Sequence, residues 1–201
     1  MSNKKIKLPA PKKEGNKSLE EIIYSRRTRR EFKTNRIKTK ELSQLLWAGQ
    51  GITDPGMTKR AAPSAGATYP FELYSCVHDV ENLPDGIYKY VPNQNELKNI
   101  SDEDIKRELK SITFDQSFVS KAAVNIVLVA DYRKTTDVYD DRGVRYVNIE
   151  AGHIAQNICL QSESLSLEAV LVGSFDDEKL TKLLNLKDKK PLYILSIGKI
   201  K

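Results

Sequence analysis

The sequence predicts an α+β domain in which a central sheet is packed by helices. Short runs rich in β-branched and aromatic residues, which are typical of strands, lie in the middle and near the end of the chain. A long stretch over 142–165 has apolar residues at helical spacing. The length of 201 residues fits one domain, because a chain of this size buries about 70% of its surface on folding. Helical and strand patterns without internal repeats then favour one sheet covered by helices.

The first 17 residues differ in composition from the rest. They carry six lysines and two prolines but few residues that form a core, so we expect a flexible basic arm over 1–17 and a single folded domain over 18–201. Residues 1–40 hold 14 Lys and Arg against four Glu, whereas residues 41–201 hold 19 against 23 acidic residues. The net charge of +6 is therefore concentrated near the N-terminus.

Two helices are expected before the first strand pattern. Ser18 and Glu21 form a capping box that begins the first helix. The second begins near Thr39, continues with Leu and Trp residues at helical spacing, and ends at Gly51. The stretch 54–70 contains three prolines and two glycines in 17 positions, which predicts a loop.

The remaining elements follow from apolar patterns and capping residues. Strands are expected at 71–77, 86–91, 124–131, 167–173 and 192–198, with a turn at 92–95 that leads into ELKNI. Further helices are expected from Ser101-x-x-Asp104, over 142–165 and after Asp176. The run VNIVLVAD at 124–131 is the strongest candidate for a buried strand.

Composition and motifs exclude several classes of protein. Cys76 and Cys159 are too few for a disulfide framework, and two histidines do not provide a conventional zinc site. No apolar run approaches 18 residues and no apolar stretch follows the N-terminal lysines, so we expect a cytoplasmic protein without a transmembrane helix or signal peptide. The chain has no nucleophile elbow, Rossmann glycine motif or phosphate-binding loop of the Walker type.

The run Arg26-Arg27-Thr28-Arg29-Arg30 points to an anionic ligand. Four guanidiniums within five positions repel one another, and in an extended segment Arg26, Thr28 and Arg30 would face the same side. Two guanidiniums and a hydroxyl suit a phosphate group. The alternative is a solvated basic face or a nucleic-acid patch. No aromatic residue lies between the arginines and the chain after residue 40 is acidic, so one phosphate is favoured and a nucleic acid is not expected.

Two loops consist of small residues. Small side chains let the backbone approach a flat ligand closely and expose N–H groups to it. The first loop is Pro63-Ser64-Ala65-Gly66-Ala67, for which an ordinary surface turn is the alternative. The second is Val172-Gly173-Ser174, which follows an expected strand.

These segments belong to six stretches, which follow one another along the chain as SRRTRREF (25–32), ELSQLLWAGQGIT (41–53), APSAGATYPFELYSCV (62–77), DGIYKYVPNQNEL (85–97), RYVNIEAGHIAQNICLQ (145–161) and VLVGSFDD (170–177). In this order they resemble the FMN-dependent nitroreductase family, and within it the SagB-type dehydrogenases. The resemblance implies a mainly antiparallel sheet flanked by helices and an intertwined homodimer with FMN at the interface.

The resemblance also implies roles for individual residues. The FMN phosphate and ribityl chain would be held by Arg26, Arg27, Thr28 and Arg30. The isoalloxazine ring would be reached from the partner subunit by Pro63, Ser64, Ala65 and Ala67, and approached near N5 by Val172, Gly173 and Ser174. Asp115 or Gln116 would contact its pyrimidine edge, and a basic residue near the end of the chain, Lys199 or Lys201, would meet the phosphate.

The implied reaction is a ping-pong transfer of electrons from NADH or NADPH to flavin N5 and then to a small acceptor such as a nitroaromatic or a quinone. The flavin carries this chemistry, so no acid–base triad and no metal are expected. One alternative is an azoline dehydrogenase of the SagB type, which uses a Lys–Tyr pair as base. Here the nearest pair is Arg145-Tyr146, and arginine is a poor base because it stays protonated. Another alternative is a basic-arm binder of RNA or another polyanion.

Overall fold

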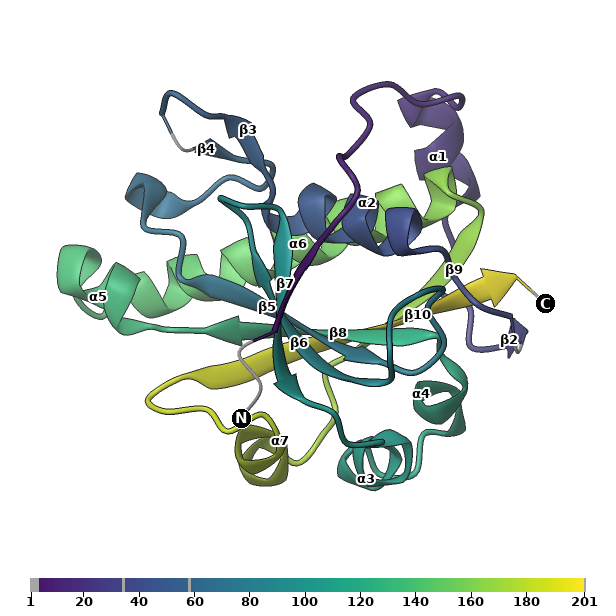
Figure 1. Cartoon of the computed structure of the whole chain (residues 1–201). Coiled ribbons are helices and arrows are strands. Elements are labelled where there is room, and N and C mark those ends of the chain that lie inside the picture. The colour runs from purple at the N-terminus through teal and green to yellow at the C-terminus, as the bar shows by residue number, and fades with distance from the viewer. Residues whose placement is uncertain (1–3, 34, 58, 201) are drawn as a thin grey trace.

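The computed structural model describes residues 4–33, 35–57 and 59–200, and its centre is an eight-stranded antiparallel sheet (Figure 1). The strands follow the order β1 (Lys5–Lys7), β7 (Glu96–Ser101), β6 (Gly86–Val91), β5 (Phe71–Val77), β8 (Val124–Ala130), β10 (Lys190–Ile200) and β2 (Phe32–Lys33). β9 (Leu167–Val172) pairs with the other edge of β10. A separate ribbon is formed by β3 (Ile52–Asp54) and β4 (Lys59–Arg60). The predicted α+β fold with a mainly antiparallel sheet is confirmed.

Helices cover both faces of the sheet (Figure 1). One face carries α2 (Thr39–Gln50) and α6 (Arg142–Ser164), and the other carries α3 (Lys106–Ile112), α4 (Ser117–Lys121) and α7 (Asp177–Leu183). α1 (Leu19–Ser25) lies near one end of α6, whereas α5 (Arg133–Tyr139) and the short 3₁₀ helix η1 (Ala65–Ala67) lie near its other end. No helix within the described ranges is long and apolar enough to cross a membrane.

The strand β8 is buried along its whole length, as its apolar sequence predicts. Ile126 and Leu128 belong to the core beneath α2 and α6, whereas Val127 and Val129 belong to the core beneath α3, α4 and α7. Successive side chains of a strand point to opposite faces, so a strand covered on both sides is a continuous apolar run. This double burial makes β8 the middle of the domain.

One predicted boundary is wrong. Ser101 ends β7 instead of opening a helix, and α3 begins only at Lys106. The carboxylate of Asp104 accepts a hydrogen bond from the Lys106 N–H at 3.0 Å, so the acidic residues lie just before the helix rather than in it. The ladder between β6 and β7 extends to Ser101 and determines where the strand ends. The helices α4 and α5 and the strands β1 to β4 were not predicted.

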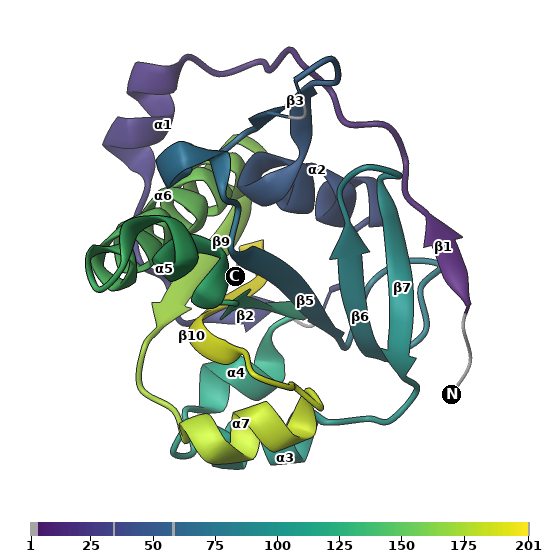
Figure 2. The same ribbon diagram turned by 90° about the vertical axis from the view of Figure 1, so that its left-hand side faces the viewer.

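The expected free arm is also not observed over residues 4–17. β1 pairs with β7 at the edge of the sheet, and Leu8 is only 3% exposed (Figure 2). Ser43 Oγ donates to the carbonyl of Pro9 at 2.6 Å, and the amide of Gln44 exchanges hydrogen bonds with the backbone of Lys12. Polar residues in the middle of α2 and an open strand edge therefore hold a segment whose composition is typical of a solvated arm.

A buried polar contact attaches α4 to the sheet. Asn125 of β8 and Ser196 of β10 are both fully buried. Asn125 Nδ2 donates to the carbonyl of Val119 in α4 at 3.0 Å, and Ser196 Oγ donates to Asn125 Oδ1 at 2.6 Å. The position of α4, which matters for the site described below, therefore depends on a side-chain amide inside the sheet.

This contact yields a matched pair of substitutions. Ser196→Ala should lower the free energy of unfolding by about 1–2 kcal/mol, because Asn125 Oδ1 is then left buried without a donor. Ser75→Ala removes an equally buried hydroxyl that has no hydrogen-bond partner among the residues described, so it should leave the stability unchanged or slightly raised. Urea unfolding monitored by fluorescence measures both. Equal losses for the two variants would contradict the role given to Ser196.

Candidate functional site

The arginine segment, residues 26–30, leaves α1 as an extended chain. Ser18 caps α1 as predicted, since its hydroxyl accepts a hydrogen bond from the Glu21 N–H at 3.1 Å. Beyond the segment, Phe32 in β2 pairs with the end of β10 and is buried. A Cβ at Gly198 would lie 2.9 Å from the Phe32 ring, so only glycine allows this close contact. The segment is thus held at both ends.

Arg29 anchors the middle of the segment. Its guanidinium lies 3.2 Å from Glu163 of α6 and 3.8 Å from Glu168 of β9, and its N–H donates to the carbonyl of Ala169 at 3.5 Å. Burial raises the pKa of Glu168, and the Arg29 charge partly offsets this effect. Glu163 and Glu168 therefore neutralise the charge of Arg29 within the fold.

The other arginines have no carboxylate partner among the residues that the structure describes. Arg27 donates to the carbonyls of Tyr24 and Arg26, both at 2.8 Å. The Arg30 guanidinium lies 5.9 Å from the centre of the Phe118 ring in α4. Arg26 is half-buried and Thr28 is exposed. The segment thus presents cations whose charge the fold does not neutralise.

The structure brings Gln116 next to the end of β9. Gln116 Nε2 donates to the carbonyls of Thr113 at 3.0 Å and Ser174 at 3.2 Å. Gly173 and Ser174 are exposed, whereas the Val172 side chain is buried, so Val172 offers a ligand only its backbone.

Gln116 is the residue just before α4, and Phe118 lies within this helix. Arg30, Gln116 and the end of β9 at Gly173 and Ser174 therefore surround one short helix. Asp115, the other candidate for the pyrimidine edge, is exposed and lies 3.7 Å from Lys110. The arginine segment and the β9 end together form what we call the first half-site.

Lys199 is already paired. Its amino group lies 2.9 Å and 3.0 Å from the two carboxylate oxygens of Glu41 in α2. The sequence does not predict this contact, because the two residues lie 158 positions apart. Lys201, the other candidate, lies outside the described residues.

The small-residue loop, residues 63–67, lies against α5. Its backbone turns through left-handed conformations, with φ of 56° at Gly66 and 55° at Ala67. A Cβ at Gly66 would lie 2.5 Å from the hydroxyl oxygen of Tyr139, so this position favours glycine for its conformation, and a larger side chain would also have to displace Tyr139. Pro63 is exposed, and Ser64 and Ala65 are half-buried. The loop exposes small groups on a rigid support.

Beneath this loop lies a buried polar cluster that sequence reasoning missed. Glu150 of α6 is 3% exposed, and its Oε1 atom has no hydrogen-bond partner within the described ranges of the chain. Burial raises the pKa of Glu150 to about 7, although hydrogen bonding to Ser64 and the charge of Arg60 lower it in part. Arg60 donates to Gln50 and lies 4.7 Å from the centre of the Tyr69 ring. These contacts join the loop to α2 and α6.

A signal for this cluster was present in the sequence. Val147, Ala151 and Ile154 form the buried stripe of α6, and Glu150 lies on the same side of the helix. A carboxylate at an apolar position of an amphipathic helix indicates a buried partner.

The first half-site and the small-residue loop lie near opposite ends of α6 (Figure 1). Arg29 contacts Glu163, whereas Ser64 lies at Glu150, thirteen residues earlier. At 1.5 Å per residue these points are about 20 Å apart along the helix. One protomer therefore does not bring the two predicted groups of ligand-binding residues together.

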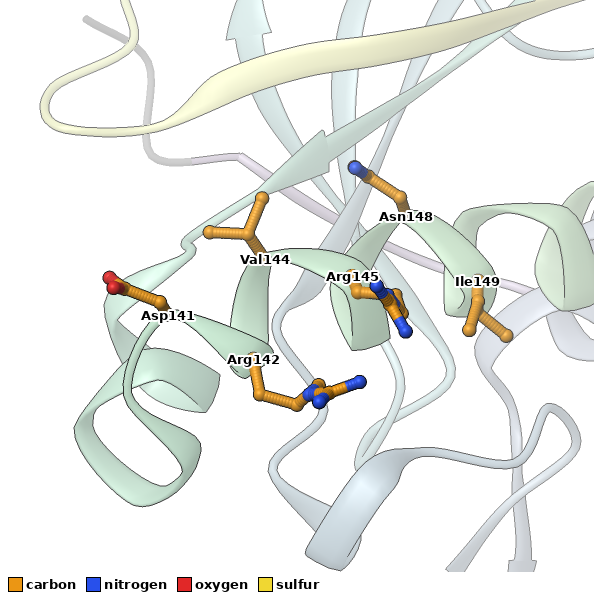
Figure 3. Close-up of a pocket in the computed structure, with 6 residues that line it drawn as sticks. All are labelled: Asp141, Arg142, Val144, Arg145, Asn148 and Ile149. Carbon is orange, nitrogen blue, oxygen red and sulfur yellow. The ribbon is translucent and has the colours of Figure 1, made fainter.

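An open depression of about 740 Å³ lies on the solvent side of α6 near the same loop (Figure 3). Its lining residues are Asp141, Arg142, Val144, Arg145, Asn148 and Ile149. Sequence reasoning noted Arg145 only for its neighbour Tyr146, whose ring packs edge-on against Tyr139 at 5.1 Å.

Comparison with known proteins identifies the family. A profile described as the nitroreductase family matches residues 23–199. The chain belongs to the nitroreductase family. A Methanocaldococcus jannaschii protein described as a nitroreductase is 40% identical over 181 residues, which are 90% of each chain. The microcin B17-processing protein McbC of Escherichia coli is 25% identical, and the match covers 83% of this chain but only 64% of McbC.

Solved structures agree with this assignment. A Ralstonia eutropha protein described as a nitroreductase has a TM-score of 0.87 and 27% identity, with 98% of this chain and 90% of that chain covered. The NADPH:FMN oxidoreductase of Vibrio harveyi shares the fold at a TM-score of 0.65 and 19% identity, over 90% of this chain and 68% of that one. These structures share the nitroreductase fold, and the match to the nitroreductase family supports an oxidoreductase class.

The buried cluster predicts a pH effect on stability. Glu150 takes up its proton more readily in the folded protein than in the unfolded chain, so its contribution to stability is complete below about pH 4.5 and is lost as the pH rises through about 7. The Glu150→Gln variant has no carboxyl group to titrate at this position, so its stability does not fall over this pH range for this reason. Between about pH 5 and about pH 8, the stability of the variant relative to the natural protein should therefore rise by about 1–3 kcal/mol.

Thermal and urea unfolding across this pH range measure the difference. Glu178→Gln, at an exposed position of α7, is the control for loss of a negative charge. A Glu150→Gln curve parallel to that of the natural protein would show that Glu150 does not titrate in this range.

Proposed function

We propose that the chain is an FMN-dependent oxidoreductase that transfers electrons from NADH or NADPH to a small acceptor such as a nitroaromatic or a quinone. The observation that carries this proposal is the first half-site. Arg26 and Arg30, for which the described residues provide no carboxylate partner, lie on the same side of the domain as the exposed Gly173 and Ser174. A phosphate at one end and a flat polar ring at the other match this arrangement.

The donor set fits FMN. Arg26, Arg27 and Arg30, with the hydroxyl of Thr28, would hold the phosphate and ribityl chain, while Arg29 keeps the segment in place through its carboxylates. Lys199 would play a smaller part, because Glu41 already neutralises its charge.

The ring end of the site has its own donors. Gln116, Gly173 and Ser174 would meet the ring edge, with Val172 contributing its backbone. When bound, the flavin supplies reversible two-electron transfer, so the protein needs to bind, orient and shield rather than to act as acid or base.

A homodimer would complete the site. The small-residue loop lies about 20 Å along α6 from the arginine segment of its own chain, so it would reach the flavin held by the partner's arginines. Exposed apolar side chains support such an interface. They include Leu19, Ile23 and Tyr24 of α1 and Val144 and Ile149 of α6, each at least 43% exposed.

In the dimer the buried cluster would act as the support for the loop. Ser64 Oγ accepts a hydrogen bond from the Tyr69 N–H at 2.9 Å, and Glu150 lies on its other side. These contacts limit the freedom of Pro63, Ala65 and Ala67 to move away from a ring that they cover. The Vibrio harveyi relative, solved with NAD⁺, supports a nicotinamide as the electron donor.

An azoline dehydrogenase is the second candidate. The similarity to McbC favours it, as does the Escherichia coli microcin synthetase complex, which has a TM-score of 0.76 and 23% identity over 96% of this chain. Arg145 argues against it, since a guanidinium stays protonated and does not remove a proton. Oxidation of an azoline peptide with bleaching of bound flavin would establish this activity.

The main proposal predicts a visible spectrum. The purified protein, or the protein incubated with FMN, should show flavin absorption, and anaerobic addition of NADH or NADPH should bleach it. Addition of a nitroaromatic or quinone should then restore the colour. Light scattering should give the mass of a dimer of the 22.8 kDa chain. A protein that stays colourless with FMN would refute the proposal.

Two arginines of the same segment provide a second test. Arg30→Ala should weaken FMN binding by about 1.5–3 kcal/mol, because a charged donor to the phosphate is lost, with little change in stability. Arg29→Ala should instead lower stability, since Glu168 is left buried without its cation.

FMN titration by fluorescence quenching and urea unfolding separate the two effects. The assignment of Arg30 would be wrong if Arg30→Ala bound FMN as tightly as the natural protein does.

A further inference from the structure

We propose that Phe114 contacts the flat ring of the electron acceptor at the proposed flavin site. Phe114 follows α3 and lies beside the ring end of the first half-site. The inference rests on the proposed function, because the acceptor would bind at the same site. It assigns a residue that determines specificity and that favours acceptors with an aromatic or quinoid ring.

The backbone of Phe114 adopts a conformation that glycine usually occupies. α3 ends in a Schellman motif, in which the Asp115 N–H donates to the carbonyl of Lys110 at 3.0 Å. The Phe114 N–H donates to the carbonyl of Ser111 at 3.1 Å, which completes the motif. Phe114 is its left-handed residue, with φ of 53°. A side chain is unfavourable in this conformation, because its Cβ lies too close to the following carbonyl oxygen.

The end of α7 provides a comparison. The Leu186 N–H donates to the carbonyl of Thr181 at 3.0 Å, and the Asn185 N–H donates to that of Lys182 at 3.0 Å. The motif is therefore the same, and its left-handed residue is Asn185, with φ of 51°. Asparagine adopts this conformation more readily, because its short polar side chain can hydrogen-bond locally. The two helix ends thus share a backbone but differ in how well the residue suits it.

No packing within the described part of the chain compensates for the strain at Phe114. Its side chain is 63% exposed and belongs to neither core cluster. Tyr69 is also bulky and left-handed, with φ of 44°, but the centre of its ring lies 4.7 Å from the Arg60 guanidinium. Strained residues are concentrated at active sites and ligand contacts. The ring of Phe114 therefore indicates a contact outside its own protomer's core.

Hydrogen bonds on both sides of Phe114 attach its turn to the end of β9. Before Phe114, the carbonyl of Ile112 accepts a hydrogen bond from the Asp176 N–H at 2.9 Å. After it, Gln116 Nε2 donates to the carbonyl of Ser174 at 3.2 Å. Phe114 is thus fixed next to the backbone that is proposed to meet the edge of the flavin ring.

The position of α3 separates Phe114 from the part of the proposed dimer interface on α6. α3 covers one face of the sheet and α6 covers the other (Figure 1). A small molecule at the first half-site is therefore the occupant that we assign to Phe114. Aromatic rings in contact attract one another beyond the effect of the apolar area that they bury. Nitroaromatics and quinones, the acceptors of the proposed function, carry such a flat ring.

Phe114→Gly tests the strain and the contact separately. At saturating FMN, it should raise the equilibrium constant for folding about threefold, because glycine is not strained in the left-handed conformation. It should also raise KM for 4-nitrobenzamide about tenfold, because the ring contact is lost. Urea unfolding and steady-state kinetics measure the two effects. Asn185→Gly, the matched control at the end of α7, should leave KM unchanged.

Further variants and ligands identify the ring as the cause. Phe114→Tyr keeps the ring and should hold KM for 4-nitrobenzamide within about twofold of the natural value, whereas Phe114→Leu should raise it about fivefold. Ferricyanide accepts electrons but has no ring, so its KM should be the same for all variants. Calorimetric titration with benzamide requires no turnover and should show an affinity about tenfold lower for Phe114→Gly than for the natural protein.

The possible outcomes are distinct. Unchanged KM and benzamide affinity in Phe114→Gly, with 4-nitrobenzamide still reduced, would overturn the inference and leave the proposed function intact. A rise in KM for NADPH alone would show that the ring meets the nicotinamide, so the assignment to the acceptor would be wrong. Dissociation of a dimer in Phe114→Gly, seen by light scattering, would place Phe114 in the interface and overturn the inference. A natural protein that takes up no FMN would overturn the proposed function, and this inference with it.

Discussion

The strand β10 is hydrogen-bonded along both edges, and the arrangement of the proposed site depends on this pairing. β8 and then β2 occupy one edge, while β9 occupies the other. The arginine segment enters the sheet through β2, and Gly173 and Ser174 follow β9. The contact between Ser196 and Asn125 then adds α4 to the same strand. Residues from distant parts of the chain thus share one side of the domain because their strands pair with, or their side chains contact, the single strand β10.

The role of each basic side chain near the proposed site depends on whether a carboxylate of the same chain already neutralises its charge. Arg29 and Lys199 have carboxylate partners inside the protein, so they stabilise the fold. Arg26 and Arg30 have none among the described residues. A solvated cation without a partner is free to attract an anion, whereas a paired one must first give up its partner.

The helix α6 connects the two regions and keeps them apart. Its C-terminal part receives Arg29 at Glu163, and Glu150 lies beneath the small-residue loop about 20 Å away. A rigid helix does not shorten, so the loop and the arginine segment of one chain stay separate. The same rigidity would allow two copies to combine these groups with defined spacing, which is the arrangement of the proposed dimer.

The sequence by itself determined the local features of the protein. Apolar patterns predicted β5, β6 and β8, and the caps at Ser18 and Asp176 predicted where α1 and α7 begin, because these signals act over a few residues. Family resemblance, carried by short motifs, indicated the residues of the candidate site.

Only the tertiary structure decided which charges are free and which segments are anchored. Lys199 is neutralised by Glu41, 158 positions away, and residues 4–17 are held by β7 and α2 although their composition is that of a free arm. The separation of the small-residue loop from the arginine segment likewise appears only in three dimensions. Pairing of this kind is set by distance in space, which a linear pattern of residue types does not encode.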